Sequence, residues 1–263
     1  MINLRKYGRE PFDIAVIHGG PGAPGEVAPV AKELASIRGA LEPLQTANTC
    51  EGQVLELKNV LEENATLPVI LIGHSWGAML SYILTARYPS LVKKLIMVAS
   101  GVFEDKYAEQ IDAARLSKLS ESERVEEISL VEALNNPETK DKDRLMARWG
   151  ELMSRADSYA PLPGNAEVQK GLEVNYDINK NVWEGAKKLR TSGELLEMGK
   201  QIICPVVAIH GDYDSHSAEG VREPLSRVVK DFRFILLEKC GHYPWRERYA
   251  RDRFYDILKS EIQ

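Results

Sequence analysis

The chain has 263 residues, 44% of them hydrophobic, and a formal net charge of -5. This length is enough to bury a large core in one domain. The negative charge gives no basic field that would attract nucleic acid or an anionic membrane surface. No run approaches the roughly 18 apolar residues that a membrane helix needs.

The first residues and the cysteines indicate the cellular compartment of the protein. Residues 1–12 contain no apolar stretch that could serve as a signal peptide. The three cysteines, Cys50, Cys204 and Cys240, lie far apart in the chain. An odd number of scattered cysteines is typical of a reducing compartment without a disulfide framework. We therefore expect a cytoplasmic protein, with no nucleic-acid or membrane partner and an oligomeric state that the sequence leaves open.

Short apolar runs predict a buried parallel sheet. They are rich in Val, Ile and Leu and do not alternate with polar residues, as in strands covered by helices on both faces. The four clearest runs are residues 12–17, 68–72, 95–99 and 206–209. Residues 232–237 are a fifth candidate, and residues 41–44 a weaker sixth because Pro43 cannot donate a ladder hydrogen bond.

Helical patterns fall between these runs. The segments concerned are residues 27–37, 53–61, 76–88, 218–229 and 246–262. Strands that alternate with helices form βαβ units with a parallel sheet, and right-handed crossovers place the helices on both faces. The sequence therefore predicts an α/β fold.

The stretch from about residue 103 to residue 191 interrupts this alternation. It is highly charged and has the pattern of several helices. Ser120 and Glu123 form a capping-box start for one of them. From residue 104 to residue 143 there are 12 acidic and 6 basic residues. We interpret the stretch as a helical insertion, with residues 1–102 and 192–263 forming the core domain. Its acidic residues are expected to be a solvated surface, with attraction of an ammonium group as the alternative.

The nucleophile motif lies directly after the second predicted strand. Residues 73–77 read Gly-His-Ser-Trp-Gly, which fits G-x-S-x-G, and a predicted helix follows at once. This strand–turn–helix context is the one in which the motif holds an exposed serine on a tight elbow. Ser75 is therefore the predicted nucleophile.

Two backbone amides are candidates for an oxyanion hole. One is that of Trp76, directly after the nucleophile. The other comes from the glycine-rich loop at residues 18–22, His-Gly-Gly-Pro-Gly, which follows the first strand. Acyl transfer needs two such donors aimed at the developing oxyanion. We assign the second donor to Gly20, with Gly19 as the alternative.

A base and an acid follow the last two strands. His242 lies just after residues 232–237, and Asp214 follows residues 206–209. The order Ser, acid, His is that of the G-x-S-x-G hydrolases, and the acid orients the imidazole of the base. Asp214 is preferred over Asp212, which lies within the turn after Gly211. His216 is the runner-up base, with a surface loop or a pocket rim as its alternative role.

Four motifs together resemble the α/β-hydrolase superfamily, and its proline iminopeptidase-like branch in particular. They are residues 18–22, 73–77, 210–214 and 241–242. The resemblance implies a catalytic triad of Ser75, Asp214 and His242, oxyanion donors at Gly20 and Trp76, and a helical cap at residues 103–191.

These residues predict a serine hydrolase that cleaves an ester or amide through an acyl-enzyme. An aminopeptidase of the proline iminopeptidase type, a carboxylesterase and a carbon–carbon bond hydrolase remain open, as does a non-catalytic receptor on the same fold. The expected partner is a small-molecule or short-peptide substrate. No metal or cofactor is implied, because the Cys, His and carboxylate residues lack zinc-ligand spacing.

Overall fold

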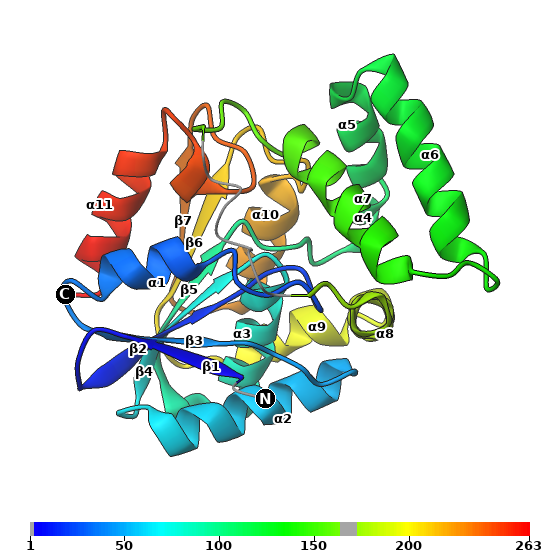
Figure 1. The fold of residues 1–263 in the computed structure, drawn as a ribbon. Coiled ribbons are helices and arrows are strands. Elements are labelled where there is room, and N and C mark those ends of the chain that lie inside the picture. The colour runs from blue at the N-terminus through cyan, green and yellow to red at the C-terminus, as the bar shows by residue number, and fades with distance from the viewer. Residues whose placement is uncertain (1–2, 164–172) are drawn as a thin grey trace.

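The computed structural model describes residues 3–163 and 173–263, and they form one seven-stranded sheet covered by helices (Figure 1). The sheet order is β1-β3-β2-β4-β5-β6-β7, with β1 antiparallel to β3 and every other neighbouring pair parallel. The strands are β1 Leu4–Tyr7, β2 Phe12–Ile17, β3 Gly39–Pro43, β4 Val69–His74, β5 Val92–Val98, β6 Val206–Gly211 and β7 Phe232–Leu237. The predicted α/β class and mostly parallel sheet are confirmed.

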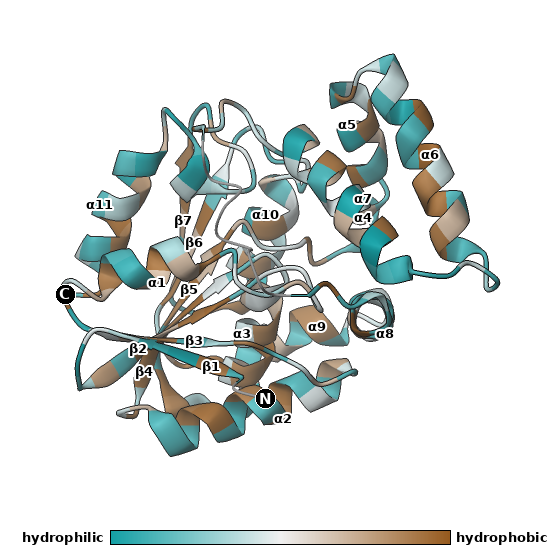
Figure 2. Ribbon diagram, in the orientation of Figure 1, coloured by the Kyte–Doolittle hydropathy of each residue, from teal (hydrophilic) through white to brown (hydrophobic). Residues whose placement is uncertain are grey.

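Two layers of helices bury the two faces of the sheet. Along β2, Ile14 and Val16 belong to one apolar cluster, while Ala15 and Ile17 belong to the other. One face is covered by α1 Ala28–Leu34 and α11 Arg251–Glu261, and the other by α2 Cys50–Asn64, α3 Trp76–Arg87 and α10 Glu219–Val228. Burial on both faces explains why the strands are continuous apolar runs, which Figure 2 shows along the middle of the molecule.

The helices of the insertion lie between β5 and β6. They are α4 Asp105–Ala108, α5 Ile111–Lys118, α6 Glu121–Asn135, α7 Lys142–Ala156 and α8 Tyr176–Thr191, and the short α9 Glu194–Glu197 follows them. Ser120 and Glu123 form the predicted capping box of α6. Part of the predicted insertion, residues 164–172, lies outside the described residues. Helices α5, α6 and α7 share a small apolar cluster that includes Leu130, Leu152 and Met153, separate from the clusters on the sheet.

The predicted C-terminal helix begins later than expected. Pro244–Arg246 form a short 3-10 helix, residues 248–250 form a turn, and α11 starts only at Arg251. Glu247 explains the delay, because its carboxylate is fully buried and accepts the amides of Tyr159 at 2.7 Å, Ala160 at 2.7 Å and Gly241 at 3.0 Å. The side chain thus binds two loops, and this tertiary contact overrides the helical pattern of the local sequence.

The edge strand β1 was not predicted. Its four residues, Leu-Arg-Lys-Tyr, lack the apolar run of a buried strand, and it pairs only with β3. Across this pair the Tyr7 hydroxyl donates to Glu42 at 2.6 Å. Glu42 is fully buried, and burial raises its pKa to about 7, against the lowering effect of Tyr7 and Arg5.

We expect Glu42 to make stability depend on pH. Between its ordinary pKa and about 7, the unfolded chain loses the Glu42 proton while the folded chain keeps it. The free energy of unfolding therefore falls as pH rises through this range, by up to about 3 kcal/mol. Urea unfolding at pH 5 and pH 8 should show this fall, and Glu42→Gln should reduce it, whereas Glu63→Gln, at an exposed position on α2, should not. An unchanged pH dependence in Glu42→Gln would contradict the assignment.

Candidate active site

Ser75 lies on a strained turn between β4 and α3. Its backbone has φ 52° and ψ -117°, a region that non-glycine residues rarely adopt. A side chain is impossible at Gly73, where an added Cβ would lie 2.2 Å from the carbonyl oxygen of Gly77, and an added Cβ at Gly77 would lie 2.4 Å from that of Ile17. Within the described part of the chain the Ser75 hydroxyl makes no hydrogen bond. The structure thus has the elbow that the motif predicts.

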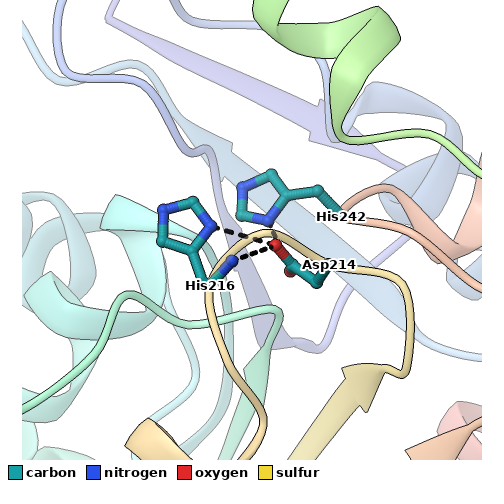
Figure 3. A group of neighbouring side chains, drawn as sticks. All are labelled: Asp214, His216 and His242. Carbon is teal, nitrogen blue, oxygen red and sulfur yellow. Dashed lines mark hydrogen bonds and ion pairs between the residues drawn. The ribbon is translucent and has the colours of Figure 1, made fainter. Parts of the chain in front are cut away.

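Asp214 and His242 meet at the ends of β6 and β7. His242 Nδ1 lies 2.7 Å from Asp214 Oδ2 (Figure 3). Both side chains are almost completely buried. Burial alone would raise the pKa of Asp214, but His242 and His216 hold it well below its usual range. An ionised Asp214 accepts the Nδ1 proton, which leaves the lone pair of His242 on Nε2.

His216 is buried, so the surface-loop alternative was wrong, and the pocket-rim alternative stays a prediction. It is 8% exposed, and its ring stacks on that of His242 with a centroid distance of 4.7 Å. Its Nδ1 lies 3.0 Å from Asp214 Oδ1, and its backbone amide donates to the same oxygen at 2.9 Å (Figure 3). One carboxylate therefore orients two imidazoles, one through each oxygen.

Asp214, His216 and His242 are also close enough together to be considered as metal ligands, with candidate atoms within 4.8 Å of one another. Each histidine, however, turns Nδ1 toward a different oxygen of an ionised Asp214. Those nitrogens donate protons and so have no lone pair for an ion, which leaves the two Nε2 atoms and a carboxylate already engaged by both histidines as the available ligands. The arrangement fits a hydrogen-bonded relay better than a resident metal.

The two candidate oxyanion donors are both unengaged. Among the described residues, the amides of Gly20 and Trp76 have no hydrogen-bond partner. The alternative donor, Gly19, gives its amide to the carboxylate of Glu26. The glycine loop also lies against the elbow, since a Cβ added to Gly19 would be 2.9 Å from the Cβ of Ser75. The geometry therefore favours Gly20 over Gly19.

The other three histidines are buried and hydrogen-bonded, as expected of packed side chains. His18 Nδ1 lies 2.6 Å from the carbonyl oxygen of Gly19, and His210 Nε2 lies 2.7 Å from that of His216. His74 joins two loops: Nδ1 is 3.1 Å from Glu26 Oε1, and Nε2 is 2.9 Å from the carbonyl oxygen of His242. Burial lowers the pKa of His74, and the hydrogen bond to Glu26 opposes this.

The inserted helices contact the loops of Asp214 and His242. The His242 amide donates to the carbonyl oxygen of Asp157 at 2.7 Å, just after α7. Arg115 of α5 donates to Asp157 Oδ2 at 2.9 and 2.7 Å, and it lowers the pKa of Asp157 against the raising effect of burial. Lys118 of α5 donates to the carbonyl oxygen of Tyr213 at 2.6 Å. The base and acid loops are thus both held by α5.

Sequence reasoning missed Glu26, Asp157 and Arg115. None of them belongs to a motif, and the contacts Glu26–His74 and Arg115–Asp157 span 48 and 42 positions in the chain. His216 was considered as a base or as part of a surface loop or pocket rim, and not as a partner of Asp214. Its proximity to Asp214 in the sequence was the one available signal for its contact with the carboxylate.

The fold and the elbow define an α/β-hydrolase, and the comparisons with known proteins agree. The family model for the alpha/beta hydrolase fold matches residues 56–247. The chain therefore belongs to the α/β-hydrolase family. Among curated proteins, it is 22% identical over 184 residues to a pimeloyl-[acyl-carrier protein] methyl ester esterase of Neisseria meningitidis serogroup B. That alignment covers 68% of this chain and 63% of the esterase, so the chain spans less than two thirds of this relative's length.

Solved structures share the whole architecture at low sequence identity. VinJ has a TM-score of 0.72 and 18% identity, covering 98% of this chain and 93% of its own. The proline iminopeptidase of Mycobacterium smegmatis has a TM-score of 0.62 and 16% identity, with the same coverages of 98% and 93%. These likenesses confirm the fold.

Proposed function

We propose that the protein is a serine hydrolase that cleaves an ester through an acyl-enzyme, with Ser75, His242 and Asp214 as its triad. The observation that carries this proposal is the strained Ser75 elbow beside a buried His242–Asp214 hydrogen bond of 2.7 Å. The bond from His74 Nε2 to the carbonyl oxygen of His242 links elbow and base loop directly. Family membership and the esterase among the curated relatives support the same reaction.

In the proposed mechanism, His242 Nε2 takes the Ser75 proton as Oγ attacks the ester carbonyl. Asp214 stabilises the imidazolium, and the amides of Gly20 and Trp76 bind the oxyanion. His242 gives the proton to the leaving alcohol as the acyl-enzyme forms. Water, deprotonated by His242, then releases the acid and restores Ser75.

Helices α4–α8 are proposed to cap this site, and a groove between them would hold the acyl group. The cap groove has a volume of about 250 Å³. It is lined by Val131, Leu134, Asn135, Met146, Trp149, Tyr176, Asn179, Lys180 and Trp183. Trp183 packs edge-on against Trp76 at 5.7 Å between ring centroids, and Asn179 donates to the carbonyl oxygen of Pro21 at 3.0 Å. The groove therefore adjoins both oxyanion segments, and its mainly apolar lining suits an apolar acyl chain.

Ion pairs of some acidic residues in the insertion support the expected solvated surface. Arg148 pairs with Glu126, Arg155 with Glu123, and Arg190 with Asp105. These pairs occupy acidic side chains that an ammonium group would need. They therefore favour an ester substrate over a peptide with a free amine.

We expect the rate to rise with acyl chain length until the cap groove is filled. Each buried methylene contributes about 0.8 kcal/mol, which corresponds to about fourfold in kcat/KM. The measurement is kcat/KM for p-nitrophenyl esters from acetate to decanoate. Val131→Phe should lower the value for long chains about tenfold and leave acetate unchanged.

Val125→Phe is the matched control, because Val125 lies on the same helix but is 65% exposed and outside the groove. A rate that is independent of chain length, or equal effects of the two variants, would contradict the acyl groove. Turnover of acetate would in that case still support the esterase proposal.

An aminopeptidase is the second candidate, and one observation favours it. Asp157 Oδ1 is buried and has no hydrogen-bond partner in the described ranges, and its backbone contacts His242. An ammonium group could pair with that oxygen. Proline-aminoacyl anilides with and without a free amine separate the two candidates, since only an aminopeptidase requires the amine. A non-catalytic receptor would fail to react with a fluorophosphonate at Ser75.

A further inference from the structure

Three loops of the proposed active site meet at a buried carboxylate and a buried imidazole. They are the glycine loop after β2, the elbow after β4 and the base loop after β7. Glu26, in the turn before α1, is 5% exposed, and His74, the last residue of β4, is 3% exposed. The mechanism above gives neither residue a role.

Glu26 fixes the orientation of the glycine loop. Its Oε1 accepts the Gly19 amide, and this leaves the next amide, that of Gly20, without a partner among the described residues. Burial alone would raise the pKa of Glu26, but the bond to His74 and the charges of His18 and His74 bring it down to about 2. Glu26 is thus a charged acceptor, which binds an amide more strongly than a neutral one.

His74 extends this contact to the base loop. Its Nδ1 faces the same Glu26 oxygen, and its Nε2 faces the carbonyl oxygen of His242. Both partners are acceptors, so a neutral His74 donates its one proton to either Glu26 or His242, and both bonds form together only when the ring is protonated. The rings of His74 and His242 are 4.8 Å apart, and Tyr243 and Trp245 enclose His74 on the same side.

We propose that Glu26 and His74 form a strut that positions the Gly20 amide and the His242 imidazole relative to Ser75. This inference rests on the proposed function and makes both side chains positioning residues. The Gly19–Glu26 bond fixes the orientation of the Gly20 amide, the proposed oxyanion donor. The His74–His242 bond fixes the distance between His242 and the Ser75 elbow. The two are coupled through the His74 ring, because its Nδ1 faces the same Glu26 Oε1 that accepts the Gly19 amide.

A purely stabilising role would not need this chemistry. Glu26 Oε2 is buried without a hydrogen-bond partner in the described part of the chain, which costs free energy. Buried charge pairs can often be replaced by apolar residues without loss of stability. The strut therefore predicts effects on kcat that exceed its effects on folding.

The test compares Glu26→Leu, Glu26→Gln and His74→Asn for kcat, KM and urea unfolding. Leu removes both contacts of Glu26, and kcat should fall about a hundredfold with KM within threefold, as for the loss of one oxyanion donor. Gln can accept from Gly19 and donate to a neutral His74, so it should restore kcat to within tenfold of wild type. His74→Asn keeps a donor near Glu26 but cannot reach His242, and it should lower kcat about tenfold.

Glu33→Gln, at a half-exposed position on α1, is the control and should leave kcat unchanged. The strut is refuted if kcat of Glu26→Leu and of His74→Asn stays within twofold of the wild-type value. It is also refuted if the loss of activity equals the loss of folded protein measured by urea unfolding. Amide hydrogen exchange at residues 18–22 gives a readout that does not need turnover. Exchange there should be at least tenfold faster in Glu26→Leu than in Glu26→Gln, and equal rates would overturn the strut. If the wild-type protein cleaves no ester but the two variants still differ in amide exchange, only the proposed function is refuted.

Discussion

Replacing Ser75 with Ala is expected to abolish ester turnover and leave the fold intact. Loss of the nucleophile in a Ser-His-Asp enzyme lowers kcat by about 10⁶-fold. The Ser75 hydroxyl makes no hydrogen bond within the described residues, so its removal leaves no buried group unpaired. The measurement is steady-state hydrolysis of p-nitrophenyl butyrate, with thermal unfolding of the same preparation and labelling by a fluorophosphonate.

Ser81→Ala is the matched control for this variant. Ser81 lies on the same helix, α3, and its buried Oγ has no hydrogen-bond partner among the described residues. We expect it to retain the activity and labelling of the wild type. Activity of Ser75→Ala within a few-fold of wild type would refute the nucleophile assignment.

Asp214→Asn is expected to lower kcat by about 10⁴-fold, the effect typical of the acid in such triads. Asn would present an amide group to His242 Nδ1, which stabilises the wrong tautomer and removes the negative charge opposite the imidazolium. The pH dependence of kcat should change as well, because Asp214, whose pKa lies well below its usual range, is charged at the pH values measured, whereas Asn is neutral. Steady-state kinetics between pH 5 and pH 9 would measure both effects.

Asp212→Asn gives the comparison at a neighbouring carboxylate. Asp212 is exposed, and its Oδ1 accepts the Cys240 amide at 3.1 Å, a bond that an Asn oxygen can keep. We expect kcat within a few-fold of wild type. A larger loss in Asp212→Asn than in Asp214→Asn would reverse the assignment of the acid.

The sheet and the elbow could be predicted because their signals are local. Strands β2 and β7 have the predicted bounds. A strand covered on both faces, such as β2, must be continuously apolar, whereas β7 is a partly exposed edge strand with an apolar sequence. The turn at Ser75 could be predicted because only glycine fits at Gly73 and Gly77. Asp214 was separable from Asp212 by its distance from Gly211, and the structure joins Asp214 to His242.

The contacts that arrange the site could not be predicted because they join distant segments. Glu26 reaches His74 across 48 positions, and Glu247 reaches Tyr159 across 88. Strand β1 was missed because an edge strand with one neighbour needs few apolar residues. The late start of α11 follows from the burial of Glu247, which sequence periodicity does not reveal.

The clamp made by Glu247 has a consequence for protein engineering. Its carboxylate holds the amides of Tyr159 and Ala160 together with that of Gly241, next to His242. Residues 157–162 therefore behave mechanically as an extension of the loop that carries the base. A chimaera that replaces the proposed cap with that of another α/β-hydrolase should retain these residues from the recipient and place the junction before residue 157. A graft that replaces residues 157–162 would change substrate specificity. It would also remove the contacts that hold the loop of His242 in place.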